Sequence, residues 1–123
     1  MNSLQTETAV SKILIVDDHT EMRRMTKFFL RDLPFEFEEC ADGADALDCN
    51  EKTNPDWILM DWKMKRMDGL TATRQIIATN PKAHVMMVSD YQEVELRNAA
   101  FEAGACQYVV KEDLLSILEI PAN

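Results

Sequence analysis

The stretch "DWILMDWKMKRMDG", residues 56–69, begins as a short apolar run, breaks at Asp61 and continues as a cationic loop that ends in glycine. Such an apolar run is typical of a strand that is buried on both faces of a parallel sheet. Burying an unpaired carboxylate costs so much that the group would protonate instead. The stretch therefore predicts a core strand whose last residue, Asp61, has partners, an exposed role, or both.

Similar short runs recur on both sides of this stretch, and segments with helical periodicity separate them. We expect strands at residues 12–17, 35–40, 56–61, 84–90 and 106–110. Apolar spacing and turn residues predict helices at 22–33, 44–51, 69–80, 93–103 and 113–120. This alternation implies an α/β fold with a parallel sheet, right-handed crossovers and helices on both faces.

The bulk composition fits one globular domain. A chain of 123 residues, 46% hydrophobic and 28% charged, can bury one core without disulfides or metals. A net charge of −9 argues against direct nucleic-acid binding, because affinity for phosphates comes from lysine and arginine. No apolar run approaches membrane-spanning length, and three cysteines without a C-x-x-C pair favour the cytoplasm. We expect a polar leader at 1–11, one domain at 12–120 and a tail at 121–123.

Reactive residue types stand at the carboxyl ends of the expected strands. They are Asp17, Asp18, Asp61, Ser89 and Lys111. Because the carboxyl ends of parallel strands meet at one edge of a sheet, these side chains should converge. Like charges about 4 Å apart repel by roughly 4 kcal/mol at a dielectric near 20, so the three carboxylates need a cation, and oxygen ligands suit Mg²⁺. A carboxylate beside Mg²⁺, a hydroxyl and an ammonium can attack phosphorus, which makes Asp61 the candidate phosphoacceptor.

The same residues carry a resemblance to a known family. The segments "ILIVDDH", "ILMDWKM...MDG", "VMMVSD" and "AGACQYVVKED" resemble the receiver domain of bacterial two-component response regulators over residues 12–120. The resemblance implies a flavodoxin-like (βα)₅ sandwich with strand order 2-1-3-4-5. It also implies a signalling phosphoacceptor rather than a turnover enzyme, which takes its phosphoryl group from a histidine kinase or a phosphotransfer protein.

The resemblance assigns the metal ligands residue by residue. Asp17, Asp18 and Asp61 match the positions that bind Mg²⁺ in the family, and the backbone carbonyl of Lys63 matches a further ligand. Asp61 is also the residue that would receive the phosphoryl group.

Other residues match the family's switch. Ser89 and Lys111 would bind the phosphoryl oxygens, and Tyr108 resembles the aromatic residue that changes rotamer as Ser89 moves inward. The output surface would comprise the fourth helix, the fifth strand and the fifth helix, within residues 93–120. A homodimer through that surface is a further expectation.

The sequence departs from the family pattern after the lysine. Many receivers have a proline joined by a cis peptide there, but Glu112 follows Lys111. A cis bond to a non-proline residue costs about 3 to 4 kcal/mol, so we expect a trans peptide. Lys65, which follows Met64, likewise stands where many receivers have a proline. From Lys63, Asp90 and Tyr91 we predict an altered phosphoryl lifetime, of either sign.

Two alternatives remain open at this stage. The departures allow a pseudo-receiver, an interaction module that does not depend on phosphorylation. An aspartyl-nucleophile hydrolase of the haloacid-dehalogenase type would place an Asp-x-Asp pair after the first strand, whereas Asp17 and Asp18 are adjacent. The "DDH" opening and the acidic Glu112 resemble receivers that are attached to helix-turn-helix output domains. A short last helix, 113–120, favours a truncated chain over a stand-alone receiver.

His19 and the basic side chains of the first expected helix each allow a structural and a functional interpretation. We interpret His19 as a polar residue of the loop that enters the first helix, rather than as a ligand or base. The basic side chains of that helix form either a solvated face or a docking face for kinases and phosphotransfer domains. They are Arg23, Arg24, Lys27 and Arg31.

Overall fold

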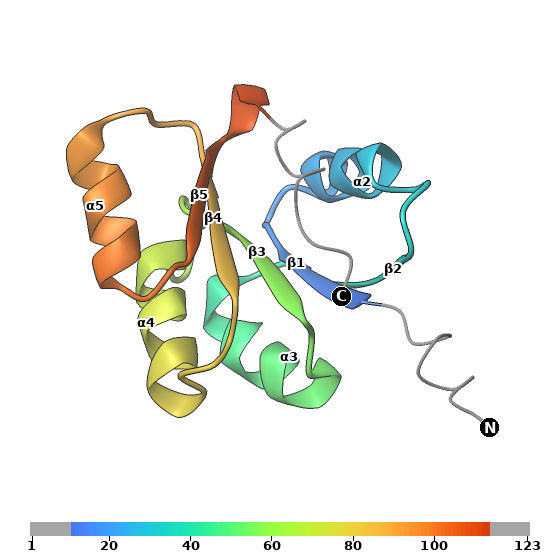
Figure 1. Cartoon of the computed structure of the whole chain (residues 1–123), viewed down its shortest axis with the longest axis horizontal. Helices are drawn as coiled ribbons and strands as arrows, with labels where there is room; N and C mark the ends of the chain where they lie inside the picture. Colours follow the sequence, from blue (N-terminus) through green and yellow to red (C-terminus); the bar gives the residue numbers. More distant parts are fainter. Residues whose placement is uncertain (1–10, 114–123) are drawn as a thin grey trace.

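Five parallel strands form one sheet in this computed structural model, which describes residues 11–113. They are β1 (Ser11–Val16), β2 (Phe35–Cys40), β3 (Trp57–Asp61), β4 (Val85–Ser89) and β5 (Gln107–Val110) (Figure 1). The order β2-β1-β3-β4-β5 confirms the predicted topology. The leader before residue 11, the tail and nearly all of the predicted last helix lie outside the described residues.

The strand register brings the predicted reactive residues to one edge. Val16 pairs with Met60, so the next residues along the two strands, Asp17 and Asp61, come side by side. The first strand ends at Val16, one residue earlier than predicted, and Asp17 begins the following loop. Its amide still donates to the carbonyl of Cys40, 3.0 Å away, which continues the ladder past the strand.

The helices follow the predicted order with adjusted ends. They are α2 (Thr20–Phe29), the short 3₁₀ helix η1 (Gly43–Asp45), α3 (Ala46–Thr53), α4 (Gly69–Thr79) and α5 (Val94–Glu102). The Asp68 side chain accepts a hydrogen bond from the amide of Thr71 and so caps α4. Among residues 11–113, no helix is long and apolar enough to cross a membrane.

The sheet separates two apolar clusters because successive side chains of each strand point to opposite faces. One cluster contains Leu14, Ile58, Met60 and Met87 and is covered by α3, α4 and α5. The other is built on alternate positions such as Ile13, and α2 lies over that face (Figure 1). Every residue of β3 is buried, which explains its continuous apolar run up to Asp61.

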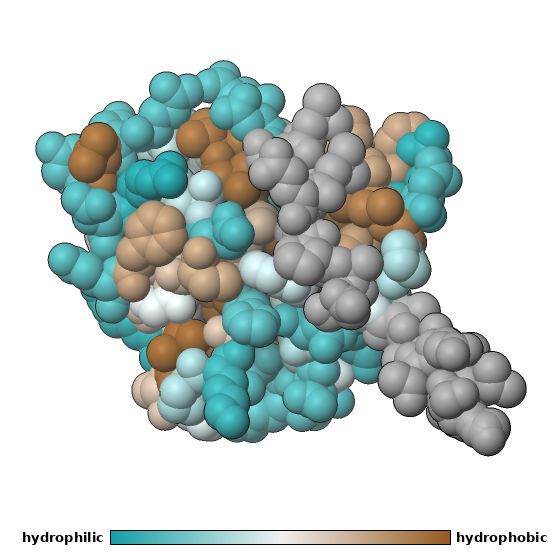
Figure 2. All heavy atoms as spheres, in the orientation of Figure 1, coloured by the Kyte–Doolittle hydropathy of each residue, from teal (hydrophilic) through white to brown (hydrophobic). Residues whose placement is uncertain are grey.

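The first helix differs from the prediction in its length and its buried face. It ends at Phe29 rather than at residue 33, because the chain turns toward Pro34, which cannot continue a helix. The predicted apolar face included Met25, but Met25 is 45% exposed, and the helix buries Thr26 instead. The Thr26 hydroxyl donates to the carbonyl of Met22, so its burial leaves no unpaired donor. Apolar side chains therefore reach the surface on α2 (Figure 2).

Candidate functional site

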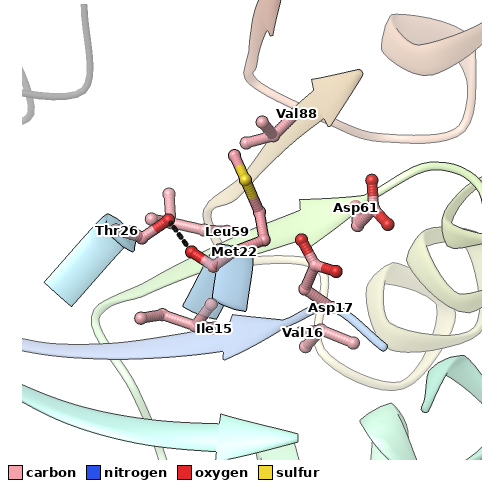
Figure 3. A pocket seen from close by; sticks show the side chains of 8 residues that line it. All are labelled: Ile15, Val16, Asp17, Met22, Thr26, Leu59, Asp61 and Val88. Atoms are coloured by element: carbon pink, nitrogen blue, oxygen red, sulfur yellow. Dashed lines mark hydrogen bonds between the residues drawn. The ribbon is translucent and has the colours of Figure 1, made fainter. Parts of the chain in front are cut away.

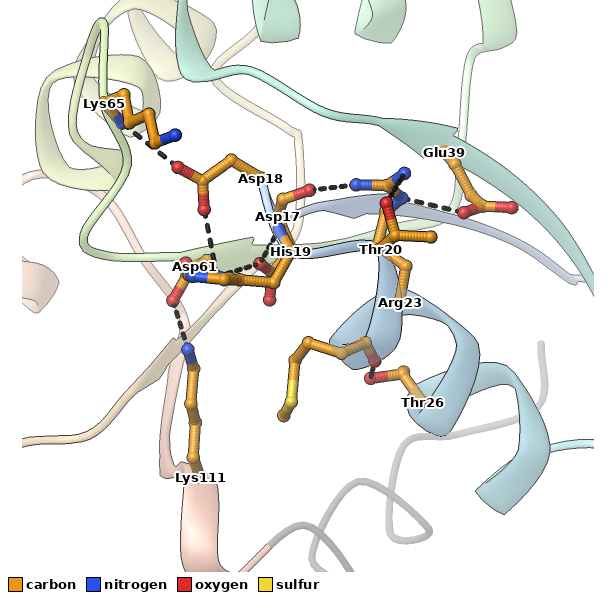
Figure 4. Close-up of polar contacts among 11 residues, drawn as sticks. Asp17, Asp18, His19, Thr20, Arg23, Thr26, Glu39, Asp61, Lys65 and Lys111 are labelled. Carbon is orange, nitrogen blue, oxygen red and sulfur yellow. Dashed lines mark hydrogen bonds and ion pairs between the residues drawn. The ribbon is translucent and has the colours of Figure 1, made fainter.

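Three carboxylates and an ammonium converge at the carboxyl edge of the sheet, as the topology predicts. Asp17 and Asp18 follow β1, Asp61 ends β3 and Lys111 follows β5 (Figure 4). Each of the three aspartates offers a carboxylate oxygen, and His19 offers a ring nitrogen. These ligand atoms all lie within 4.8 Å of one another.

Asp61 is the most deeply buried charged residue of this group, with 3% of its surface exposed. Its Oδ1 lies 2.9 Å from Nζ of Lys111, whereas Oδ2 has no hydrogen-bond partner among the described residues. Burial, together with the charges of Asp17 and Asp18, raises the pKa of Asp61 to about 6, although Lys111 opposes that shift. One oxygen is thus engaged, and the other is available to a ligand.

Lys111 reaches Asp61 without the proline found in many receivers. The peptide bond to Glu112 is trans, as predicted, since the described residues contain no cis peptide. Burial disfavours the charge on Lys111, but the hydrogen bond and charge of Asp61, with the charge of Asp17, outweigh it and raise the pKa of Lys111. Glu112 itself accepts a hydrogen bond from the side chain of Gln92 in the loop after β4.

The acidic pair is held by the backbone around it. The amide of His19 donates to Oδ1 of Asp17 at 2.9 Å, and Arg23 donates to the Asp17 carbonyl at 2.6 Å. The amide of Lys65, in the loop after β3, donates to Oδ2 of Asp18 at 3.2 Å. These bonds place the acidic pair against the loop that follows Asp61.

Two hollows meet the acidic cluster. The inner one is lined by Asp17 and Asp61 with apolar neighbours that include Met22, and its volume of about 10 Å³ is close to that of one water molecule (Figure 3). The outer one, about 330 Å³, is bordered by Lys63, Asp90, Lys111 and other rim residues. Lys63 borders this outer hollow, and the role of its carbonyl as a ligand stays a prediction.

Ser89 and Tyr108 meet at a shared neighbour rather than at Asp61. The Ser89 hydroxyl accepts a hydrogen bond from the amide of Tyr91 at 3.1 Å, and the Tyr108 hydroxyl donates to the Tyr91 carbonyl at 2.7 Å. Tyr108 is buried, and its ring lies edge-on to Trp62 with centroids 6.4 Å apart. Trp62 directly follows Asp61, so these contacts connect Asp61, the Ser89 hydroxyl and Tyr108.

The basic side chains of α2 form contacts within the protein, and two of them, Arg24 and Arg31, are also exposed to solvent. Arg23 and Lys27 both bind Glu39 of β2, at 2.8 Å and 2.6 Å. Arg24 pairs with Glu21, and Arg31 donates to the carbonyl of the residue three positions earlier. The arginine and lysine that hold Glu39 stabilise the packing of α2 beside β2.

Sequence reasoning missed two contacts of the site. His19 does stand in the loop before α2, as interpreted, but its Nδ1 also lies 3.2 Å from Asp17 and 3.0 Å from Asp18. The contact between Trp62 and Tyr108 was not expected either. The available signal was sequence adjacency, because His19 directly follows Asp18 and Trp62 directly follows Asp61.

Comparison with known proteins identifies the fold's relatives. The response regulator receiver domain matches residues 13–119. The chain is 38% identical over 106 residues to the regulatory protein AtoC of Escherichia coli and 37% identical over 115 residues to the transcriptional regulatory protein DegU of Brevibacillus brevis. These alignments cover 85% and 91% of the chain but only 23% and 48% of the relatives. The chain thus spans less than half the length of either.

Solved structures of response regulators have the same fold as this chain. A LuxR-family response regulator from Aurantimonas superposes with a TM-score of 0.84 at 29% identity, covering 90% of this chain and 81% of that one. The CheX–CheY–BeF₃–Mg complex from Borrelia burgdorferi gives 0.83 at 26% identity, with 89% and 84% covered. Receiver domains are signalling phosphoacceptors, and the acidic cluster of Asp17, Asp18 and Asp61 is consistent with such a site. Fold, site and sequence together show that this chain belongs to the response regulator receiver domain family of two-component signalling.

Proposed function

We propose that Asp61 accepts a phosphoryl group from a histidine kinase or a phosphotransfer protein. One observation carries the proposal: a buried carboxylate lies between two other carboxylates and a lysine, with one oxygen lacking a hydrogen-bond partner in the described part of the chain. That oxygen attacks phosphorus, the phosphorus–oxygen bond forms, and the bond to the donor's leaving group breaks with its electron pair. The product is an acyl phosphate on Asp61.

The donor set fits Mg²⁺, which prefers carboxylate oxygens, carbonyls and waters. Asp17, Asp18 and Asp61 would hold the ion, with the backbone carbonyl of Lys63 as a further ligand. When bound, the ion would neutralise charge on the transferring group. Its positive charge would also favour the ionised form of Asp61, whose pKa of about 6 otherwise lies close to neutral pH.

Lys111 and Ser89 complete the proposed reaction site. Lys111 already lies 2.9 Å from Asp61, so its ammonium can bind a phosphoryl oxygen with little movement. The Ser89 hydroxyl accepts a hydrogen bond from Tyr91 in this structure, and it would reorient to donate to another phosphoryl oxygen. Because Tyr108 is bonded to the carbonyl of the same Tyr91, that movement would reach Tyr108.

The link from Ser89 through Tyr91 to Tyr108 suggests which surface transmits the signal. Tyr108 lies on β5, beside α5, so we propose that the surface of α5, β5 and the chain after it changes on phosphorylation, and that it is the surface for a homodimer. AtoC and DegU are named as regulators, which supports an output in transcription. Three free cysteines in the described residues support a cytoplasmic location.

Incubation with acetyl phosphate and Mg²⁺, followed by intact mass spectrometry, tests the proposal. The wild-type protein should gain one phosphoryl group, and Asp61→Asn should gain none. Glu39→Gln is the matched control, because Glu39 is also a carboxylate paired with a lysine but lies outside the site. It should be modified like wild type.

An unmodified wild-type protein under these conditions would contradict the proposal. It would favour the pseudo-receiver, in which partner binding is indifferent to Mg²⁺ and phosphodonor. Modification of the Asp61→Asn variant to the wild-type level would instead show that the acceptor is another residue.

A further inference from the structure

We propose that His19 is a fourth side-chain ligand of the metal site, and that it gives the site a preference for divalent transition metals such as Co²⁺ over Mg²⁺. The inference deepens the proposed function, since it concerns the same site. Carboxylates alone suit Mg²⁺, whereas an imidazole nitrogen adds affinity mainly for transition metals.

The first argument is distance. Around an octahedral ion with bonds of about 2.1 Å, neighbouring ligand atoms are about 3 Å apart and opposite ones about 4.2 Å. Nδ1 of His19 lies 3.0 Å from Oδ1 of Asp18 and 3.2 Å from Oδ1 of Asp17. One ligand atom each from Asp17, Asp18, His19 and Asp61 fits within 4.8 Å. The two His19 contacts match neighbouring positions of one coordination sphere, whereas the full set, up to 4.8 Å across, would contract slightly around an ion.

The second argument is that buried oxygens in the cluster have no donor. Among the described residues, Oδ1 of Asp18 and Oδ2 of Asp61 are buried without a hydrogen-bond partner, and Asp61 is 97% buried, given its exposure of 3%. The contact between Asp18 and the His19 ring is close but lacks hydrogen-bond geometry. Buried oxygens of this kind need a proton or a cation.

The third argument is the place of the His19 ring: its Nδ1 lies within hydrogen-bonding distance of Oδ1 of Asp17, at 3.2 Å, a contact that a bound ion would replace. Within residues 11–113, its side chain makes no capping hydrogen bond to α2, although His19 is the residue before that helix. The ring borders the outer hollow beside Asp18, Lys63 and Lys111, so it faces the site and an ion could enter past it. Its backbone bonds, to Asp17 and Arg23, do not depend on the imidazole.

Isothermal titration of the tag-free protein with Co²⁺ and with Mg²⁺ tests the inference. His19→Gln should lower Co²⁺ affinity about tenfold, a typical loss around a metal site, and change Mg²⁺ affinity less than about twofold. His84→Gln is the matched control, because His84 is the second of two histidines and lies before β4, at the opposite end of that strand from the site. It should behave like wild type with both ions.

A second readout detects the nitrogen directly. Pulsed electron paramagnetic resonance of the Mn²⁺-loaded protein should show hyperfine coupling to a ¹⁴N nucleus in wild type and His84→Gln, and none in His19→Gln. This signal reports a bond to nitrogen and does not depend on phosphorylation.

Each result decides between assignments. Equal Co²⁺ affinity in wild type and His19→Gln would overturn the inference and leave the proposed function intact. Tighter binding of both ions by His19→Gln would also overturn it, since the ring would then compete with the ion as a counter-charge for the aspartates. Failure of wild type to bind any divalent ion would overturn the inference together with the proposed Mg²⁺ site.

Discussion

Two carboxylates in this protein are each bonded to a lysine, yet their acidities change in opposite directions. Asp61 lies 2.9 Å from Lys111 in the site, and Glu39 lies 2.6 Å from Lys27 on the outer side of the sheet. The pKa of Asp61 is raised to about 6, mainly by burial, whereas hydrogen bonds from Lys27 and Arg23 lower the pKa of Glu39. An ion pair therefore does not by itself tell which carboxylate is functional.

The surroundings explain the contrast. The Glu39 side chain is 36% exposed and has two cationic partners, so water and charge both favour its ionised form. At Asp61, three carboxylates cluster around one ammonium group, that of Lys111. Only 3% of the surface of Asp61 is exposed to solvent. The site thus has excess negative charge that a bound cation can relieve, while the Glu39 cluster is already satisfied.

The largest expected effect is a pH dependence that belongs to Asp61. Its pKa is higher in the folded protein than the ordinary value of 3.8, so the folded state binds more protons between about pH 4 and pH 6. Its contribution to stability is therefore lost as the pH rises through this range. A shift of roughly two units corresponds to about 3 kcal/mol. In urea unfolding with a chelator present, the free energy of unfolding of Asp61→Asn relative to wild type should increase by about 3 kcal/mol between pH 4 and pH 7.

A flat difference between these two proteins across the range would show that Asp61 is not held at a raised pKa. Glu39→Gln serves as the control, because the depressed pKa of Glu39 places its effect at lower pH.

The next effect tests the two lysines against each other. Lys111→Gln should destabilise the protein by about 2 kcal/mol near neutral pH, because it leaves a buried carboxylate that must protonate. Lys27→Gln should cost less than about 0.5 kcal/mol, since Glu39 keeps Arg23 and water. Free energies of unfolding from urea titrations provide the measurement. Equal losses would mean that burial does not separate the two pairs.

The last effect, which is also small, concerns Glu39. Because its folded pKa is depressed, its stabilisation is present above about pH 4.5 and is lost as the pH falls through the lowered value. Glu39→Gln should cost less than about 1 kcal/mol at neutral pH, and high salt should reduce that cost. Comparing unfolding of both proteins at low and high salt checks this. A cost that is insensitive to salt would place Glu39 in a more buried environment than the structure shows.

The fold could be predicted from sequence because its signals are local. Short apolar runs between turn residues determine five strands, and parallel topology alone brings Asp17, Asp61 and Lys111 to one edge. The strand ends shifted by only a residue, since pairing rather than hydrophobicity decides where a strand stops.

Other features depend on contacts that no local pattern encodes. Apolar spacing favoured Met25 as a buried residue of α2, but Thr26 is buried because its hydroxyl is satisfied by the helix itself. The bond between Tyr108 and the Tyr91 carbonyl joins residues 17 positions apart. The approach of the His19 ring to the aspartates depends on the backbone path of a loop, which composition does not specify.

Gly69 has a consequence for how this protein can diversify. A β-carbon there would lie 2.0 Å from the carbonyl oxygen of Asp61, and the Gly69 amide donates to the Trp62 carbonyl at 2.6 Å. The segment 63–68 is therefore closed at its base, with Asp61 fixed on one side and α4 on the other. Side-chain substitutions within that segment can therefore vary the rim of the site without displacing Asp61, provided that the Lys65 amide keeps its bond to Asp18 and Asp68 keeps its cap on α4.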